Sequence, residues 1–480
     1  MENRPSRLTD YIRANRALYF IDSSNQQEFT YTELVDAYVV DNSLGLLFLY
    51  VENSMKCLSA FFSAMETDAT VVLLSSKLPE ELKKNLETQY SPNIIIDPQR
   101  HEIEHYQLIE VENGAFKLNY FWQPEDNLDY RSGNKIASEI KLLLSTSGTT
   151  GSPKLVKLSE ENLISNSESI ASYLPISAED VVPLNLPINY SYGLSVLLSN
   201  CIFGGKILVS NEDFLTRKFW DDFNKYDCNS FAGVPINYEI LDRIGFRNWQ
   251  LNRLKYFTQA GGKLSEAYIE KFEQYAIQTQ SKFFVMYGAT EATARMSYLP
   301  PQYLESKRGS IGIPVANGEF KIDEISGELI YKGPNVFGGY AQNSRDLEYW
   351  ENQKELLTGD LARLDQDGFY YITGRIKRIV KLSGNRINLD EVERFLAEKT
   401  NHSFKSIGVD DKYLCLFYLD TDSVIENSEI IITEDEKNAI KKVLQMDFKI
   451  HPTQVKFKGL KNVPLTSNGK VDYTGLKDLI

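Results

Sequence analysis

The sequence predicts an α/β protein with a large N-terminal domain, a β-rich subdomain inside it and a small α+β domain at the C-terminus. Over most of the chain, short apolar runs of strand length alternate with helix-length amphipathic stretches. From about residue 318, glycine-punctuated segments with alternating apolar positions take over. The charge also changes, because residues 378–480 hold 16 basic and 16 acidic side chains and leave 36 and 50 to the rest.

Continuous apolar runs are typical of strands that are buried on both faces of a sheet. The expected strands are LGLLFLYV (44–51), TVVLLSS (70–76), NIIID (93–97), IKLLLST (140–146), GKILVS (205–210), KYFTQAGG (255–262) and KFFVMYG (282–288). A helix is expected after Ser159, a suitable N-cap, because Glu160 and Glu161 place negative charge at its start. The β-rich part contains GEFKIDEISGELIYKG and LLTGDLARLDQDGFYYITGR, and the domain boundary is expected near GRIKRIVK, residues 374–381.

The composition allows a folded enzyme, and the chain is expected to be a soluble protein of the cytoplasm. With 480 residues and 42% hydrophobic content the chain can bury several cores. A net charge of -14 argues against binding to nucleic acid or to anionic membranes through long-range attraction. The four cysteines lie far apart without a CxxC pair, so they predict neither a zinc site nor disulfides. The N-terminal residues do not resemble a signal peptide, and no apolar stretch is long enough to span a bilayer.

The stretch LLLSTSGTTGSPKLVKLS, residues 142–159, predicts a phosphate-binding loop between a strand and a connection into a helix. Closely spaced glycines and hydroxyl side chains let backbone N–H groups converge on phosphate oxygens. The loop is not of the Walker type, because Pro153 stands where that pattern needs glycine and no Ser or Thr follows Lys154. On these residues alone, an ordinary flexible turn is the alternative.

Six segments together carry a resemblance to a known family. They are STSGTTGSPKLV, MYGATEA, GELIYKGPNVFGGY, LLTGDL, GRIKRIVKLSGNRINLDEVE and PLTSNGKVDY, in this order. The chain resembles the AMP-forming adenylating enzymes, which include acyl- and aryl-CoA synthetases, adenylation domains and firefly luciferase. The resemblance implies an adenylating domain over residues 1–375, a mobile domain over 378–480 and a hinge near Lys377. It also implies a two-step reaction, in which a carboxylic acid and ATP give an acyl-adenylate and pyrophosphate, and a thiol then takes the acyl group.

The resemblance also assigns site residues and the cofactors ATP and magnesium. Implied contacts to the triphosphate are Thr146, Ser147, Gly148, Thr149, Thr150, Gly151 and Lys154. Tyr287 with Gly288 matches the adenine contact, Thr290 a hydroxyl near the α-phosphate and Glu291 the magnesium ligand. Asp360 and Arg375 match the ribose contacts, Lys470 the lysine that reaches the α-phosphate, and Lys381 a lysine of the second half reaction. Each has an ordinary alternative: a core aromatic for Tyr287, a turn for TGD and a solvated loop lysine for Lys470.

The same resemblance places the pocket for the acid. Its candidate residues are Tyr190, Tyr192, Gly193, Asn237, Gly261, Gly288 and Ala289. Amino-acid adenylation domains commonly carry an Asp where Gly193 stands, and that Asp pairs with the substrate's α-ammonium group. A buried ammonium without a counter-charge is costly, so an acid without an α-amine is expected. A further departure from the family pattern is Leu155, where glycine is usual.

Three functions remain open at this level. The leading one is an acid:thiol ligase that uses CoA or the phosphopantetheine of a carrier protein as acceptor. The second is a stand-alone amino-acid adenylation enzyme that loads a carrier protein. The third, a non-catalytic nucleotide sensor, is disfavoured because Glu291 and Lys470 are retained. The pattern HEIEH, residues 101–105, would suit zinc only on a helix, and a surface segment is the preferred interpretation.

Overall fold

The computed structural model describes residues 7–36, 45–111, 118–124, 135–145, 154–249, 251, 253–382, 385–400, 402–409, 412–420, 432–466 and 471–480. By packing, the chain divides into two compact units. The first comprises Met1–Phe320 and Tyr331–Leu356, and the second Lys321–Ile330 and Leu357–Ile480. The mixed α/β fold, with a large N-terminal and a small C-terminal part, is as the sequence predicted. The functional boundary at 375–378 and the hinge at Lys377 stay predictions.

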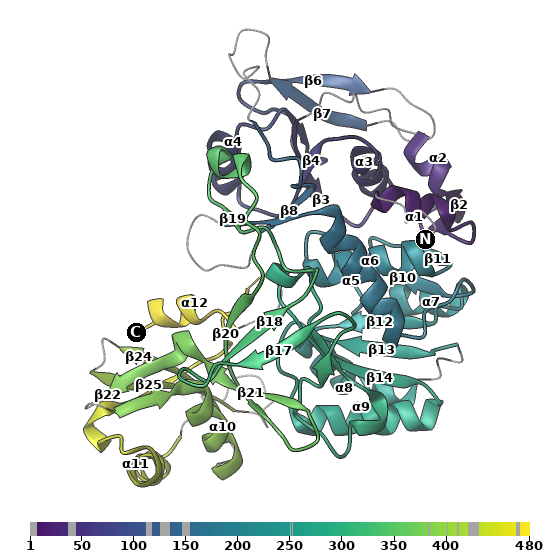
Figure 1. The fold of residues 1–480 in the computed structure, drawn as a ribbon. Coiled ribbons are helices and arrows are strands. Elements are labelled where there is room, and N and C mark those ends of the chain that lie inside the picture. The colour runs from purple at the N-terminus through teal and green to yellow at the C-terminus, as the bar shows by residue number, and fades with distance from the viewer. Residues whose placement is uncertain are drawn as a thin grey trace. The chain divides into compact units, whose positions relative to one another are not determined.

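The first unit contains an eight-stranded sheet in the order β19-β9-β8-β4-β3-β5-β7-β6 (Figure 1). Its strands are β3 (Leu46–Val51), β4 (Thr70–Ser75), β5 (Ile94–Ile96), β6 (Tyr106–Val111), β7 (Leu118–Pro124), β8 (Leu142–Ser145), β9 (Leu155–Leu158) and β19 (Tyr340–Ala341). Strands β8, β4, β3 and β5 are parallel and fully or almost fully buried, as their continuous apolar runs indicated. The helices in this part are α3 (Met55–Met65) and α4 (Glu80–Tyr90).

A second sheet of the first unit has the order β12-β13-β14-β15-β16. Its strands are β12 (Ser230–Gly233), β13 (Tyr256–Gln259), β14 (Lys282–Tyr287), β15 (Ser297–Leu299) and β16 (Ile313–Pro314), and the first three are parallel. Figure 1 shows α5 (Glu160–Tyr173) and α6 (Ser191–Phe203) on one side of these strands, and α8 (Pro235–Arg243) and α9 (Glu266–Thr279) on the other. The carboxyl ends of β12, β13 and β14 therefore meet at one edge, where α/β sheets commonly bind ligands.

A smaller sheet completes the first unit. Its order is β10-β11-β1-β2, with β1 (Tyr19–Asp22), β2 (Gln27–Thr30), β10 (Val181–Pro183) and β11 (Lys206–Val209). The remaining helices of this unit that are described are α1 (Leu8–Ala14), α2 (Tyr31–Asp36) and α7 (Arg217–Lys225). None of the helices in the described ranges combines the length and the apolar character that a membrane span requires.

The β-rich sheet predicted after residue 318 has the order β17-β18-β20-β21. Its strands are β17 (Glu319–Ile322), β18 (Glu328–Lys332), β20 (Leu356–Leu364) and β21 (Tyr370–Arg375). The rest of the second unit contains β22 (Ile379–Leu382), β23 (Asn385–Asn388), α10 (Leu389–Lys399), β24 (His402–Val409), β25 (Tyr413–Asp420), α11 (Glu434–Phe448), β26 (Val455–Gly459) and α12 (Tyr473–Asp478). This part has its own hydrophobic core, in which Leu414, Leu416 and Leu444 are fully buried.

One local prediction and one omission can be compared directly with the structure. The Ser159 hydroxyl accepts a hydrogen bond from the Asn162 amide, and Asn162 Oδ1 accepts one from the Ser159 amide, so the predicted start of α5 is confirmed. Strand β9 was not predicted, because Lys157 interrupts its four residues. Lys157 is nevertheless buried, and its ammonium donates to the carbonyl oxygen of Tyr349 at 2.9 Å.

Candidate active site

The turn after β14 holds the central residues of the candidate site. Tyr287 ends the strand, and the chain passes through Gly288 and Ala289 into a short 3₁₀ helix, Thr290–Ala292. A Cβ atom on Gly288 would lie 1.6 Å from the carbonyl oxygen of Ala294, so only glycine allows the turn to close this tightly. Thr290 and Glu291 are therefore held at the carboxyl edge of the parallel strands.

The hydroxyl groups of Thr290 and Ser191 lie 3.2 Å apart, within hydrogen-bonding distance. Ser191 is the first residue of α6, so this contact joins the start of that helix to the turn after β14. Ser191 carries no motif of its own in the sequence, although it stands between the candidate pocket residues Tyr190 and Tyr192. The structure thus brings the predicted phosphate-side hydroxyl next to the predicted acid pocket.

Glu291, the candidate magnesium ligand, is oriented by a tyrosine that the sequence motifs did not predict as a site residue. The Tyr340 hydroxyl donates to Glu291 Oε1 at 2.8 Å, and the ammonium of Lys154 lies 5.3 Å from the centre of the Tyr340 ring. Burial and the neighbouring Glu291 carboxylate raise the pKa of Tyr340, so its hydroxyl stays a donor at neutral pH. Tyr340 thus contacts both Glu291 and Lys154, the lysine that closes the glycine loop.

The donor set around Glu291 fits a magnesium ion that is shared with phosphates. Within the described residues no group of three or more His, Cys, Asp or Glu side chains could form a metal site by itself. Magnesium typically binds through one or two carboxylates together with substrate phosphates and water. A single oriented carboxylate on a glycine-closed turn matches that requirement.

Two tyrosines and a glycine form the described wall of the candidate acid pocket. The rings of Tyr190 and Tyr192 meet edge to face with centroids 6.1 Å apart. Gly261 follows β13 with φ +86°, and a Cβ atom there would lie 2.3 Å from the Tyr190 hydroxyl. The Tyr192 hydroxyl donates to the carbonyl oxygen of Thr258 at 2.8 Å. Burial raises the pKa of Tyr190 to about 12, so this wall is neutral at physiological pH.

Gly193 has a packing reason to be glycine. A Cβ atom at this position would lie 2.3 Å from the carbonyl oxygen of Pro187. An aspartate could stand here only if α6 moved, so the carboxylate that would pair with an α-ammonium group has no room. The other polar candidate, Asn237, uses Oδ1 to accept a hydrogen bond from the Val234 amide at the start of α8. Its assignment to the pocket, like that of Ala289, stays a prediction.

The candidate ribose contacts lie in the second unit and form a pair. Asp360 on β20 and Arg375 on β21 are register partners, and Arg375 Nε donates to Asp360 Oδ1 at 3.0 Å. Asp360 is buried, whereas the Arg375 side chain is largely exposed. Lys377 lies in the 3₁₀ turn Ile376–Arg378, and Lys381 is exposed on β22. The remaining candidates, Thr146, Ser147, Gly148, Thr149, Thr150, Gly151 and Lys470, lie outside the described residues.

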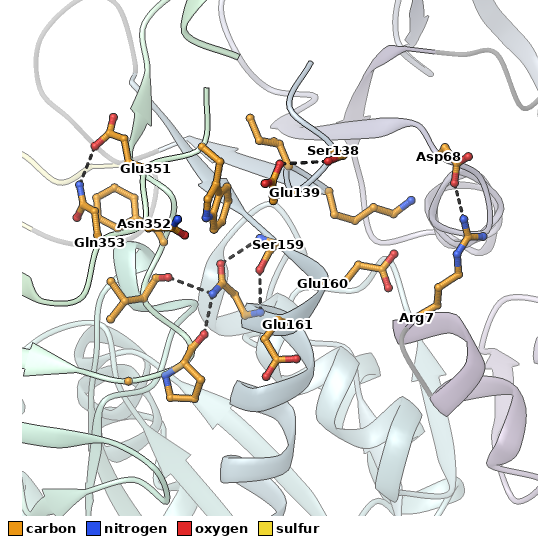
Figure 2. A pocket seen from close by; sticks show the side chains of 18 residues that line it. Arg7, Asp68, Ser138, Glu139, Ser159, Glu160, Glu161, Glu351, Asn352 and Gln353 are labelled. Atoms are coloured by element: carbon orange, nitrogen blue, oxygen red, sulfur yellow. Dashed lines mark hydrogen bonds and ion pairs between the residues drawn. The ribbon is translucent and has the colours of Figure 1, made fainter. Parts of the chain in front are cut away.

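The large cavity of about 850 Å³ in the first unit is not the candidate nucleotide site. Leu142 of β8 pairs with Leu158 of β9 at the end of this hairpin away from the glycine loop, and the neighbouring Lys141 and Ser159 line the cavity. Figure 2 shows Glu160 and Glu161, at the start of α5, among the lining side chains. Acidic side chains at this place do not suit a triphosphate.

The histidine pattern at 101–105 does not form the zinc arrangement. His101 lies in a bend, and His105 has a left-handed backbone with φ 68°. The segment is therefore not a helix, and its two histidines do not share a helix face. The preference for a surface segment is confirmed by the exposure of both side chains.

The comparisons with known proteins agree with the geometry. A family model described as AMP-binding enzyme matches residues 46–341. The chain is 29% identical over 390 residues to an oxalate–CoA ligase of Saccharomyces cerevisiae, covering 74% of this chain and 69% of the relative. It is 26% identical over 363 residues to a 2-succinylbenzoate–CoA ligase of Bacillus cereus, covering 72% and 71%.

The fold is similar to that of the O-succinylbenzoate coenzyme A synthetase of Bacillus subtilis in complex with ATP and magnesium ion. That structure has a TM-score of 0.77 and 20% identity, over 99% of this chain and 100% of that one. A structure of the same synthetase in complex with the acyl-adenylate intermediate OSB-AMP gives a TM-score of 0.75 and 19% identity, over 99% and 98%. The match of the family model over more than half of the chain, together with the motifs on the turn after β14, shows that this protein belongs to the AMP-binding enzyme family, the AMP-forming adenylating enzymes.

Proposed function

We propose that this protein is an ATP-dependent ligase that joins a carboxylic acid to CoA. In the first step the acid and ATP form an acyl-adenylate and pyrophosphate, and in the second the CoA thiol takes the acyl group and AMP leaves. The observation that carries the proposal is the turn after β14, which holds Glu291 against Tyr340 and brings the Thr290 hydroxyl to Ser191, the residue between the candidate pocket residues Tyr190 and Tyr192. The relatives named above are CoA ligases, which supports CoA as the acceptor.

The chemistry explains why the site needs these groups. Attack of a carboxylate on the α-phosphate brings two anions together, so fixed donors and cations must stabilise the charge that develops. Thr290 offers a hydroxyl beside the start of α6, and Lys154 and Lys470 are the expected cations. Glu291, held by Tyr340, would bind magnesium, which when present neutralises charge on the phosphate oxygens. Asp360 and Arg375 are the proposed ribose contacts.

The substrate is proposed to lack an α-amine. The packing of Gly193 against Pro187 leaves no room for the carboxylate that amino-acid adenylation would require. Oxalate and 2-succinylbenzoate, the acids in the names of the two relatives, carry no amine either, and each has two carboxylates. A carrier-protein phosphopantetheine is the second candidate acceptor. We place the enzyme in the cytoplasm, since all four cysteines are free thiols.

Exchange of pyrophosphate into ATP, measured with magnesium and a panel of simple acids, diacids and amino acids, tests the first step. We expect exchange with an acid that lacks an amine, and formation of its CoA thioester when CoA is added. Glu291→Gln should lower exchange at least 100-fold, the scale expected for one charge-stabilising group. Exchange with amino acids alone would favour the carrier-protein alternative. ATP binding without exchange for any acid would favour the non-catalytic sensor.

A further inference from the structure

Arg295 is a fully buried cation without a counter-ion in the described structure. It lies between the Thr290 turn and β15, and only 1% of its surface is exposed. Its Nε and Nη1 atoms have no hydrogen-bond partner within the described ranges, and its neighbour there is the neutral Tyr192 side chain, whose pKa is raised by burial. A buried arginine whose charge is uncompensated is costly, so folding alone does not account for its presence. Such a residue indicates a missing anion.

The guanidinium group borders the wall of the acid pocket. Its central carbon lies 4.1 Å from the centre of the Tyr192 ring. Beside it is a small cavity of about 10 Å³ whose lining includes Ser199, Asn200 and Thr258. Asn200 Oδ1 also has no partner among the residues described. Arg295 therefore lines a small, largely apolar cavity that carries a few polar groups and has room for about one water molecule, and it lies against a tyrosine already assigned to the pocket.

The position of Arg295 relative to the reacting end follows from α6. The first residue of that helix, Ser191, contacts Thr290, and the next residue, Tyr192, contacts Arg295. Thr290 and Arg295 also belong to the same turn between β14 and β15. An acid whose reacting carboxylate lies near Thr290 can thus extend along the first turn of α6 toward the guanidinium group.

We propose that Arg295 binds a second carboxylate of the acid, so that the substrate is a dicarboxylic acid activated at one end. This inference rests on the proposed function. A guanidinium group presents paired N–H donors that match the two oxygens of a carboxylate, and the bound anion would supply the missing counter-charge. The Tyr192 ring covers the guanidinium group in the described conformation, so binding requires this side chain to turn aside.

Matched pairs of acids test the inference on the unmodified enzyme. Oxalate, malonate, succinate, glutarate and phthalate are compared with their half-amides, which keep the shape and one carboxylate but lose the second charge. We expect kcat/KM for pyrophosphate exchange to favour the best diacid over its half-amide by about 100-fold or more, because a site built for a charged group rejects an analogue that leaves its donors unpaired. An equal or better rate with the half-amide would overturn the inference.

Substitution of Arg295 gives a second test. Arg295→Gln should remove most of the preference by lowering kcat/KM for the diacid, while kcat/KM for the half-amide changes less than about threefold. Arg295→Lys should restore part of the diacid rate. Arg308→Gln is the matched control, because Arg308 is a partly buried arginine paired with Glu273 on α9, and it should leave the preference unchanged. The melting temperature of each variant shows whether it folds.

The outcomes separate the two proposals. In one outcome the enzyme exchanges pyrophosphate with acids that have a single carboxylate and shows no preference for diacids. That result would overturn the role of Arg295 and leave the ligase function standing. Equal losses for diacid and half-amide in a folded Arg295→Gln variant would assign Arg295 to packing and would also overturn the inference. No exchange with any acid would overturn the ligase function, and the inference with it.

Discussion

Tyr340 fixes one carboxylate oxygen of Glu291, and this contact should matter for magnesium. Groups that hydrogen-bond a metal ligand typically change metal affinity 10- to 100-fold when they are removed. We expect Tyr340→Phe to raise the magnesium concentration needed for half-maximal pyrophosphate exchange by about 10-fold or more, with little change at saturating magnesium. Tyr349→Phe is the control, because Tyr349 is exposed. An unchanged magnesium titration would contradict the role of Tyr340.

Lys470 is expected to bring positive charge to the reacting groups in the first step. Lys470→Ala should lower pyrophosphate exchange by about 100-fold or more, the scale of losing one charge-stabilising group. Lys461 is an exposed lysine that precedes Lys470 in the same C-terminal segment. Its substitution to alanine is the control and should leave the exchange rate unchanged. Similar rates for both variants would remove Lys470 from the mechanism.

Motifs predicted some site residues and could not predict others. Thr290, Glu291 and Asp360 stand in patterns that are recognisable in the sequence alone. Tyr340 and Arg295 do not, because their interest comes from the side chains that folding brings to them. An arginine is usually exposed, and nothing in the sequence around it shows that Arg295 is buried against Tyr192, more than a hundred positions earlier.

At the scale of elements, the short 3₁₀ turn Ile376–Arg378 is held in place by the side chain of its last residue, Arg378. Arg378 pairs with Asp390 and Glu393 of α10, and its guanidinium carbon lies 3.8 Å from the centre of the Tyr473 ring on α12. A removed partner would leave buried charges unpaired, so these contacts are expected to persist during any movement. A change of backbone direction is therefore easier at Lys377 than at Arg378.

A proline at position 377 should restrict the proposed hinge, because its ring fixes φ. We expect Lys377→Pro to slow thioester formation at least 10-fold more than pyrophosphate exchange, since the second half reaction depends on the rearrangement. Lys377→Ala removes the same side chain without restricting φ and should affect both half reactions only weakly. Equal losses of both half reactions in the proline variant would argue against a hinge at this residue.

Strands were predictable where the run of apolar residues is continuous, whereas β9 was missed because a lysine interrupts its run, although all four of its residues are buried. Strands β3, β4 and β14 are runs of apolar residues, which a sequence reveals directly. Strand β9 contains Lys157, whose ammonium reaches the carbonyl oxygens of Asp346 and Tyr349 nearly 200 positions away. Such a partner is set by the tertiary fold and leaves no local pattern.

At the scale of the whole molecule, each unit has a core of its own. We expect thermal unfolding to show two transitions, and Leu416→Ala should destabilise the second unit by about 2–5 kcal/mol because Leu416 is fully buried in its core. Calorimetry of the variant should show one transition lowered and the other unchanged. Leu479→Ala, at an exposed position of the same unit, is the control. One transition that shifts as a whole would contradict the separate cores.

The charge balance predicted that the chain changes character near its last hundred residues, but packing divides it earlier, at Leu357. Strand β21 explains the difference. Its residue Thr373 accepts a hydrogen bond from Arg394, and the Arg375 amide donates to Asp390, so β21 packs with α10 although its composition resembles the preceding residues. The composition of β21 can be counted from the sequence, whereas its packing against α10 becomes visible only in the folded structure.

The four cysteines, all buried, have a practical consequence for the study of acyl transfer. Burial raises the pKa of Cys57 to about 12 and also raises the pKa values of Cys201, Cys228 and Cys415. Only the thiolate form reacts readily with electrophiles. The native protein should therefore neither acylate itself from its own adenylate nor titrate with a chromogenic sulfhydryl reagent. Disappearance of the acceptor's sulfhydryl can then be followed colorimetrically, with the folded enzyme as a silent background.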